Sequence, residues 1–188
     1  MTTEQYPPRV VLHCCCAPCS SAILEWMDHH GVEPVIYYCN PNIYPREEYE
    51  IRKNEITRYA QDKGLTIIDD DYDHEDWLRY IKGMEHEPER GGRCLLCFRY
   101  RLLRTARMAQ QLGIGHITTT LASSRWKSLE QINAAGLWAA ESTEGVTWWD
   151  RNWRKGGLQE RRNQLLREIG FYNQQYCGCE FSMRPQGI

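Results

Sequence analysis

The sequence lacks the long apolar run that a membrane-spanning helix needs. No window of its 188 residues approaches the roughly 20 consecutive apolar residues of such a helix. Residues 1–9 also lack a basic segment followed by an apolar stretch, so we expect no signal peptide and no membrane partner. These two absences predict a cytoplasmic protein, and in the cytoplasm scattered cysteines are normally reduced.

A strong excess of positive charge is missing as well. The formal net charge is −2, which gives no general argument for nucleic-acid binding. The distribution is less even, because residues 93–107 and 151–167 are both rich in arginine. From charge alone, these stretches are either a local binding surface for a polyanion or solvated helix faces.

Internal repeats and low-complexity linkers are also absent, so we expect one α/β domain that spans residues 1–188 and binds metal. Short β-prone runs alternate with helical periodicity, which predicts a parallel sheet of about five strands flanked by helices. An irregular, cysteine-containing tail is expected from Phe171 onward. The expected strands are 10–12, 34–39, 65–68, 116–121 and 146–149, and the expected helices are 20–30, 45–63, 73–81, 94–112, 128–141 and one after Gly157.

Cysteine is the residue that the sequence does have in quantity. Four of the nine cysteines lie within residues 13–20, directly after the expected strand 10–12. Thiols at the carboxyl end of a strand, in front of a helix N-terminus, suit a soft metal centre better than core packing. Ligands of parallel α/β folds gather at that edge of the sheet, so we expect the unusual residues to converge there.

Two further cysteine pairs extend this group. Cys94 and Cys97 open a helix, and alone they fit a redox pair, half of a zinc knuckle or two cluster ligands. Together with adjacent thiols of the first loop, they reach the four thiolates of a zinc site or a [4Fe–4S] cluster. Adjacent cysteines place their thiols poorly for a single tetrahedral ion, which favours the cluster. Cys177 and Cys179 could form an easily reduced disulfide, serve as metal ligands or have no function.

Acidic residues follow the third expected strand. Asp71 and Asp73 fit ligands of a second metal or proton carriers, and Asp73 also fits a helix N-cap.

The order of these motifs resembles the QueH family of epoxyqueuosine reductases, which is unrelated to the cobalamin-dependent type. The resemblance covers residues 9–182 and is carried by Cys15-Cys16-Ala17-Pro18-Cys19, Tyr38-Cys39-Asn40-Pro41-Asn42-Ile43, Asp71-Tyr72-Asp73, Arg93-Cys94-Leu95-Leu96-Cys97-Phe98, Thr118-Thr119-Thr120-Leu121 and Tyr176-Cys177-Gly178-Cys179-Glu180-Phe181-Ser182. It implies a HUP-type α/β fold and an oxidoreductase of queuosine biosynthesis. Such an enzyme would reduce the epoxide of epoxyqueuosine at the wobble position of tRNA, with electrons from an external donor.

The resemblance also implies roles for single residues. Cys15, Cys16, Cys94 and Cys97 match the ligands of the family's [4Fe–4S] cluster. Cys177 and Cys179 match its terminal pair and are our candidate redox pair. For the family's additional iron, and for catalysis, our candidates are Asp71 and Cys19. Cys14 leaves an ambiguity, because Cys14-Cys15 could be the adjacent pair. We prefer Cys15-Cys16, because the following Ala-Pro-Cys fixes the register.

If the substrate is tRNA, the arginine-rich stretches acquire a role on its phosphates. The expected phosphate-binding residues are Arg93, Arg99, Arg101, Arg151, Arg154 and Lys155. Two other functions stay open. One is a zinc-dependent tRNA-binding module without catalysis. The other is a nucleotide-dependent tRNA-modifying enzyme of the same fold. Such an enzyme needs a phosphate-binding loop after the first strand, and cysteines occupy that place here.

Overall fold

A five-stranded sheet lies at the centre of the computed structural model, which describes residues 5–183. Its strand order is β3-β2-β1-β4-β5, and all four neighbouring pairs are parallel. The strands are β1 (Arg9–His13), β2 (Glu33–Tyr38), β3 (Ile67–Asp69), β4 (His116–Thr119) and β5 (Thr147–Trp148). The predicted α/β fold is therefore confirmed.

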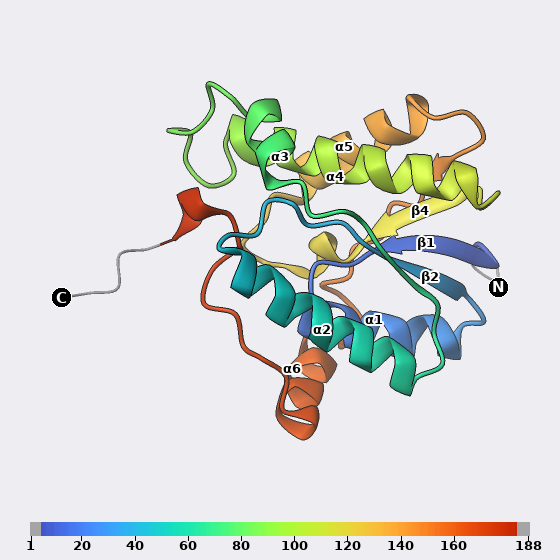
Figure 1. The fold of residues 1–188 in the computed structure, drawn as a ribbon. Coiled ribbons are helices and arrows are strands. Elements are labelled where there is room, and N and C mark those ends of the chain that lie inside the picture. Colours follow the sequence, from blue (N-terminus) through green and yellow to red (C-terminus); the bar gives the residue numbers. More distant parts are fainter. Residues whose placement is uncertain (1–4, 184–188) are drawn as a thin grey trace.

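Helices cover both faces of this sheet (Figure 1). On one face lie α1 (Ala17–His29), α2 (Arg46–Asp62) and α6 (Leu158–Ile169). On the other face lie α3 (His74–Tyr80), α4 (Gly92–Gln111) and α5 (Leu129–Glu141). None of the helices among residues 5–183 is long and apolar enough to cross a membrane.

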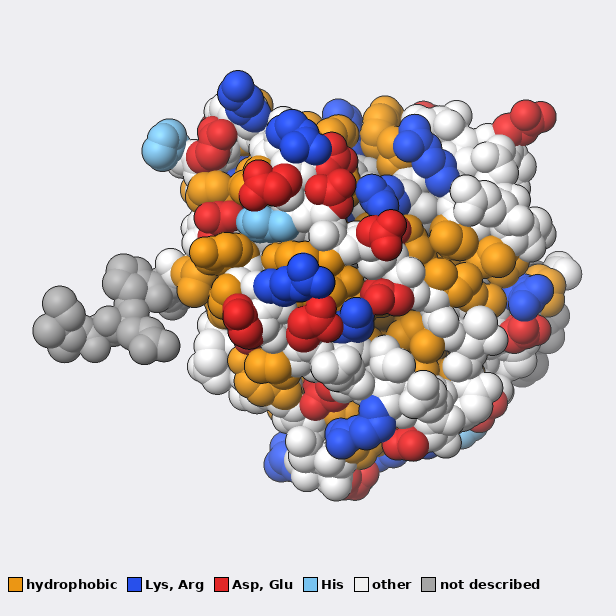
Figure 2. Space-filling model, viewed as in Figure 1, with side chains coloured by type: hydrophobic (Ala, Val, Ile, Leu, Met, Phe, Trp, Pro, Cys, Tyr) orange, Lys and Arg blue, Asp and Glu red, His pale blue; other side chains and the backbone are white. Residues whose placement is uncertain are grey.

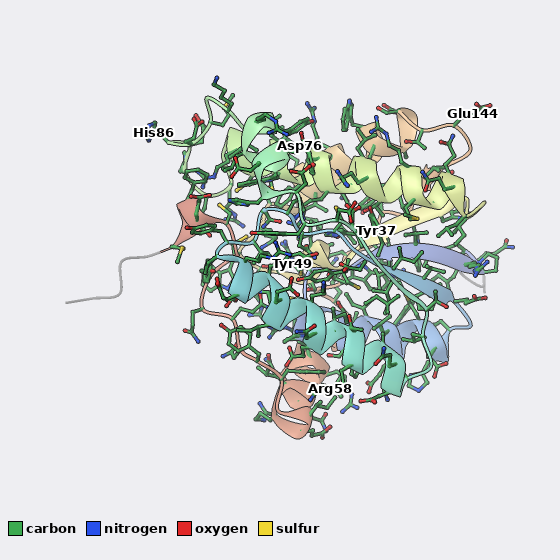
Figure 3. All side chains as sticks on the ribbon, viewed as in Figure 1. Tyr37, Tyr49, Arg58, Asp76, His86 and Glu144 are labelled. Atoms are coloured by element: carbon green, nitrogen blue, oxygen red, sulfur yellow. The ribbon has the colours of Figure 1, made fainter. Side chains whose placement is uncertain are left out.

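The central strand explains why the layers hold together. Val10, Val11 and Leu12 of β1 are fully buried, as expected for a strand with helices on both sides. Large aromatic side chains complete the interior, and Tyr37 and Tyr49 lie there at 2% and 1% exposure (Figure 3). Burial of such side chains contributes about 1.5–3 kcal/mol each, so the three-layer packing supplies much of the stability.

Several predicted boundaries differ from the structure by one to three residues, and two of these differences bear on the cavity described below. Helix α1 begins at Ala17 instead of residue 20, because Pro18 is compatible with the first helical turn. Cys16 is consequently the N-cap residue, and Cys19 lies in the first turn. Strand β4 ends at Thr119 rather than at residue 121, since Thr120–Ser123 form a 3-10 helix.

The sheet reverses its strand order between β1 and β4, the position at which parallel sheets bind ligands. After α6, the C-terminal tail runs back to this carboxyl edge and forms a 3-10 helix there, Glu180–Ser182 (Figure 1). On the face that carries α2 and α3, acidic and basic side chains are interspersed (Figure 2). That face therefore presents no continuous basic surface.

Candidate active site

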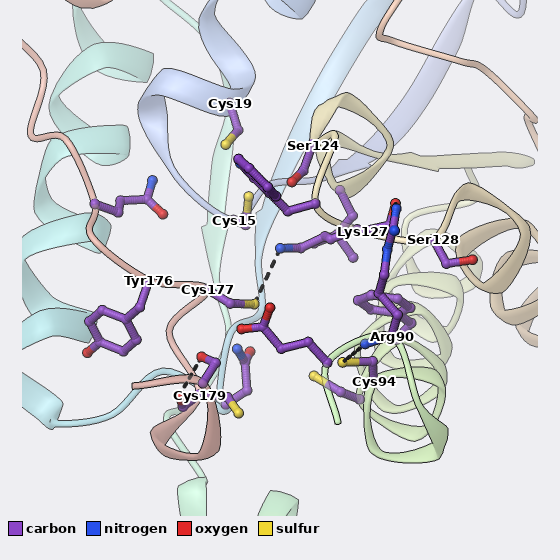
Figure 4. A pocket seen from close by; sticks show the side chains of 18 of the residues that line it. Cys15, Cys19, Arg90, Cys94, Ser124, Lys127, Ser128, Tyr176, Cys177 and Cys179 are labelled. Carbon is purple, nitrogen blue, oxygen red and sulfur yellow. Dashed lines mark hydrogen bonds between the residues drawn. The ribbon is translucent and has the colours of Figure 1, made fainter. Parts of the chain in front are cut away.

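A cavity of about 540 Å³ opens beyond the carboxyl ends of β1 and β4. Three separate parts of the chain bring cysteine side chains to its wall: the β1–α1 loop, the start of α4 and the C-terminal tail (Figure 4). The lining cysteines are Cys15, Cys19, Cys94, Cys97, Cys177 and Cys179. The predicted convergence of the cysteine motifs at this edge is confirmed.

The β1–α1 loop contributes a compact group of three thiols. The Sγ atoms of Cys15, Cys16 and Cys19 all lie within 4.8 Å of one another, and those of Cys15 and Cys16 are 3.8 Å apart. Cys14 is fully buried among core side chains and does not line the cavity. The chain just after β1 thus turns Cys14 toward the core and leaves Cys15 facing the cavity. The loop backbone is fixed in part by Thr120, whose Oγ1 accepts the Cys15 N–H at 3.3 Å.

Cys94 and Cys97 lie one turn apart at the start of α4. The Arg90 N–H donates to Cys94 Sγ at 3.4 Å, and Arg101 Nη1 lies 3.9 Å from Cys97 Sγ. Burial raises the pKa of both thiols. Both therefore keep their protons until a cation replaces them, as metal binding requires.

The tail supplies the last two thiols of the wall. Lys127 Nζ donates to Cys177 Sγ at 3.3 Å. Between the two cysteines, Gly178 has φ +122°, and a Cβ there would lie 2.9 Å from Ile43 Cγ1, so only glycine fits. All nine cysteines are unpaired thiols, including the pair Cys177 and Cys179, for which a disulfide was one of the expectations.

A buried ion pair holds the tail in place. Arg52 is 1% exposed and forms a salt bridge of 2.7 Å with Glu48. The same guanidinium donates to the carbonyls of Cys177 and Tyr176 at 3.1 and 3.2 Å. Glu48 in turn accepts the Tyr172 hydroxyl at 2.8 Å. The position of the terminal cysteines thus depends on residues of α2.

Negative charge in the thiol group concentrates on Cys15. Hydrogen bonds from the Cys16 and Cys19 thiols, reinforced by Lys127 and Arg101, hold its pKa well below the usual range despite burial. Burial and the neighbouring thiols raise the pKa of Cys16, and a Cys19 hydrogen bond to Cys15 raises the pKa of Cys19 to about 12. One thiolate flanked by two protonated thiols is a donor set that a thiophilic cation can complete by displacing their protons.

The two aspartates do not lie in this cavity. Asp71 is exposed and is not part of the wall, so its predicted role as metal ligand and catalytic residue gains no support from the geometry. Asp73 is the N-cap of α3, where its Oδ1 accepts the Asp76 N–H at 2.9 Å. Glu89 is the one acidic side chain among the described residues of the cavity wall.

Two of the six expected phosphate-binding residues are buried. Arg101 is 2% exposed, and its guanidinium donates to the Cys39 carbonyl at 3.3 Å and to Asn40 Oδ1. Arg93 is 3% exposed and donates to the Glu85 carbonyl at 3.0 Å. Because both guanidinium groups are almost fully buried in the cavity wall, where phosphates have little access, we do not carry their role on phosphates further.

The other four expected residues keep more exposure. The guanidinium of Arg99 lies over the Trp138 ring, and that of Arg151 lies over the ring of Trp26, at 5.3 and 4.6 Å from the centroids. Arg154 Nη2 donates to the Lys127 carbonyl at 2.8 Å, beside the cavity. Lys155 is exposed.

Several cavity residues escaped the sequence analysis. Lys127 lies on the loop after β4, and Arg90 and Arg162 come from the loop before α4 and from α6. Position after a parallel strand was the one available signal for Lys127, since such loops line the ligand-binding edge. The other residues reach the cavity only through tertiary packing.

Comparison with known proteins agrees with the geometry. A family model described as "Epoxyqueuosine reductase QueH" matches residues 10–185. The epoxyqueuosine reductase QueH of Histophilus somni is 46% identical over 94% of this chain and 72% of its own length, and that of Haemophilus influenzae gives the same values. The Thermotoga maritima protein is 33% identical over 93% of this chain and 90% of its own length. The chain therefore belongs to the QueH family, whose members are epoxyqueuosine reductases and hence oxidoreductases.

Proposed function

We propose that this protein reduces the epoxide of epoxyqueuosine, at the wobble position of tRNA, to the cyclopentene of queuosine. The observation that carries the proposal is the convergence of six thiols from three parts of the chain on one cavity, in a chain of the QueH family. Two C–O bonds break and one C=C bond forms, and the oxygen leaves as water. The reaction consumes two electrons and two protons, which fixes what the site has to supply.

The proposed cofactor is a [4Fe–4S] cluster held by Cys15, Cys16, Cys94 and Cys97. The donor set fits, because four cysteine thiolates are the usual ligands of this cluster and all four thiols are free. Cys15, Cys94 and Cys97 line the cavity, and the buried Cys16 Sγ lies 3.8 Å from Cys15 Sγ. Once bound, the cluster supplies one-electron transfer. Desolvation raises the pKa of Cys16, Cys94 and Cys97, so assembly of the cluster has to release protons from these thiols.

An additional iron is also proposed, with Cys19 as its thiolate ligand. Cys19 lines the cavity and lies beside the proposed cluster ligands. In place of Asp71, which lies outside the cavity, Glu89 is the carboxylate that the described wall offers. A site with one carboxylate oxygen and one thiolate leaves the bound iron more Lewis-acidic than a site made of thiolates alone.

Electrons and protons have a second local source in the tail. A dithiol that closes to a disulfide releases two electrons and two protons, the number that the reaction consumes. Cys177 and Cys179 are free thiols on the cavity wall and fit this redox role. After their oxidation, an external donor would reduce the disulfide again. Lys127, whose ammonium projects into the cavity, can hold a proton for the departing oxygen.

The RNA would approach over a basic rim around the cavity mouth. Of the expected residues we retain Arg154 and Lys155 here, and we add Arg90 and Arg162, which line the wall. Arg99 and Arg151 stay predictions. Contacts of this kind bind phosphates without regard to sequence, so binding should weaken as salt concentration rises.

Spectroscopy with metal analysis on anaerobically purified protein tests the cofactor. An iron–sulfur protein is brown and contains iron and sulfide, whereas a zinc-dependent binding module would be colourless. Full activity with only four irons per chain would exclude the additional iron. Conversion of epoxyqueuosine tRNA, followed by mass spectrometry of its nucleosides with a chemical reductant, tests the reaction itself.

A matched pair of variants tests the ligand register. Cys15→Ala should lose iron and sulfide, because Cys15 faces the cavity. Cys14→Ala should retain both, because Cys14 is a core residue outside the wall. Loss of the cluster in both variants, with Cys16→Ala unaffected, would assign the adjacent pair to Cys14 and Cys15 instead.

A further inference from the structure

The largest exposed ring of the described chain stands at the cavity mouth. Trp126 is 83% exposed and still belongs to the cavity wall. It lies with Arg125 at the tip of a turn that the Lys127 N–H closes on the Ser124 carbonyl at 3.4 Å. The next residue, Lys127, points inward to Cys177. One turn thus places a cation at the thiols and an indole at the entrance.

This turn is held firmly although its tip is exposed. Arg90 Nη2 donates to the carbonyls of Arg125 and Lys127 at 3.3 and 3.4 Å, and Arg154 Nη2 donates to Lys127 at 2.8 Å. Gln159 Nε2 donates to the Ser123 carbonyl at 2.8 Å. Alternate carbonyls of the turn are therefore anchored from three other elements. A preorganised ring loses little conformational freedom when a ligand stacks on it.

We propose that Trp126 is a stacking platform for an unpaired nucleobase of the RNA, a neighbour of the nucleotide that enters the cavity. The proposal rests on the function proposed above. Exposed aromatic rings that bind single-stranded RNA stack on bases, and adjacent cations hold the phosphates. Arg125 and Lys127 flank the indole in sequence, and Arg90 and Arg162 line the wall behind it.

An apolar protein partner fits this ring less well. Protein interfaces need a continuous patch, and isolated exposed apolar residues are ordinary. None of the other large hydrophobic side chains that are exposed within residues 5–183 lines the cavity. The indole is therefore a single planar surface among charged groups, which matches one base rather than an apolar protein face.

The test uses the iron-loaded protein and a labelled anticodon stem-loop RNA, with binding measured anaerobically by fluorescence anisotropy. Trp126→Ala should weaken binding about 5- to 150-fold, the usual contribution of one stacked base. Trp126→Phe should recover most of the loss, since a phenyl ring also stacks. Tyr80→Ala is the matched control, because Tyr80 is an aromatic residue of 38% exposure outside the cavity wall, and it should bind like the wild type. Iron content and circular dichroism confirm that each variant is folded and loaded.

Abasic substitutions in the loop RNA then identify the partner base. At the one loop position whose base stacks on Trp126, removal of the base should weaken binding by the wild type. The same abasic RNA should bind Trp126→Ala as tightly as the unmodified RNA does. Equal affinity of wild type and Trp126→Ala, or additive losses at every loop position, would overturn the stacking platform. Failure of the wild type itself to bind or reduce the RNA would instead refute the proposed function, so the two failures are distinguishable.

Discussion

Replacing Arg52 with methionine should detach the C-terminal tail from the cavity. Arg52 joins three partners at once: the carboxylate of Glu48 and the carbonyls of Tyr176 and Cys177. Methionine has a similar length but no donors, so all of these bonds are lost together. Glu48, at 7% exposure, would keep only the Tyr172 hydroxyl as a hydrogen-bond donor among the side chains described above.

The magnitude follows from which groups stay buried after the change. Removing one partner of a buried ion pair costs about 3–5 kcal/mol, since the remaining charge has lost its compensation. The two tail carbonyls can recover hydrogen bonds with water only if the tail leaves α2. We therefore expect the free energy of unfolding to fall by about 3–5 kcal/mol, and residues 176–181 to exchange amide hydrogen much faster.

Guanidinium unfolding of the metal-free protein measures the first effect, and hydrogen exchange with mass spectrometry measures the second. Arg58→Met is the matched control, because Arg58 is an exposed arginine of the same helix (Figure 3). In the double variant with Glu48→Gln, stability should partly return because no charge is left unpaired, while tail exchange stays fast. A change within about 0.5 kcal/mol, the range of ordinary surface substitutions, would refute the role assigned to Arg52.

Three further predictions concern single side chains. Burial would raise the pKa of Cys177, but cations, above all Lys127, outweigh it and lower that pKa. Lys127→Met should therefore shift the alkylation–pH profile of this thiol to higher pH, and an unchanged profile would contradict this. Gly136→Ala would place a Cβ 2.3 Å from Trp148 and should cost about 1–3 kcal/mol in unfolding measurements; an unaltered midpoint would exclude the clash. Burial lowers the pKa of His13 from 6.5 to about 3. Between these two pH values the unfolded chain binds a proton that the folded chain does not, so the free energy of unfolding falls as the pH drops from 6.5 toward 3, by on the order of 5 kcal/mol. His13→Gln should flatten this acid dependence of unfolding, and an identical slope would contradict it.

The sheet and the convergence of the cysteine motifs were predictable because both follow from local pattern. Apolar β-prone runs alternate with amphipathic helices, and a parallel sheet then puts every strand's carboxyl end at one edge. Cys15 and Cys94 could thus be placed near each other although 79 residues separate their positions in the sequence. Neither inference needs knowledge of side-chain packing.

The roles of charged residues could not be predicted in the same way. Arg101 reads as part of a basic helix face, yet its acceptors are the Cys39 carbonyl and Asn40 at the end of β2. Asp71 follows a strand as a metal ligand would, but the chain turns it outward, while its neighbour Asp70 pairs with Arg104 at 2.6 Å. One-residue alternation decides which aspartate faces inward, and the sequence contains no independent marker of that phase.

The tail is the part of the site that sequence least determines, and it is also the part on which the cavity depends. It supplies two of the six thiols and much of one wall, but it has no regular structure before Glu180 to predict its course. Its position comes from separate anchors: Arg52 on the carbonyls, the fit of Gly178 against Ile43, and the His74 ring nitrogen 2.9 Å from Glu180 Oε1. Because α2, the β2–α2 loop and α3 each hold it, loss of one anchor should loosen the terminal thiols without unfolding the thiol group of the β1–α1 loop. The two halves of the proposed chemistry, cluster binding and dithiol oxidation, are therefore separable by substitutions outside the cysteines.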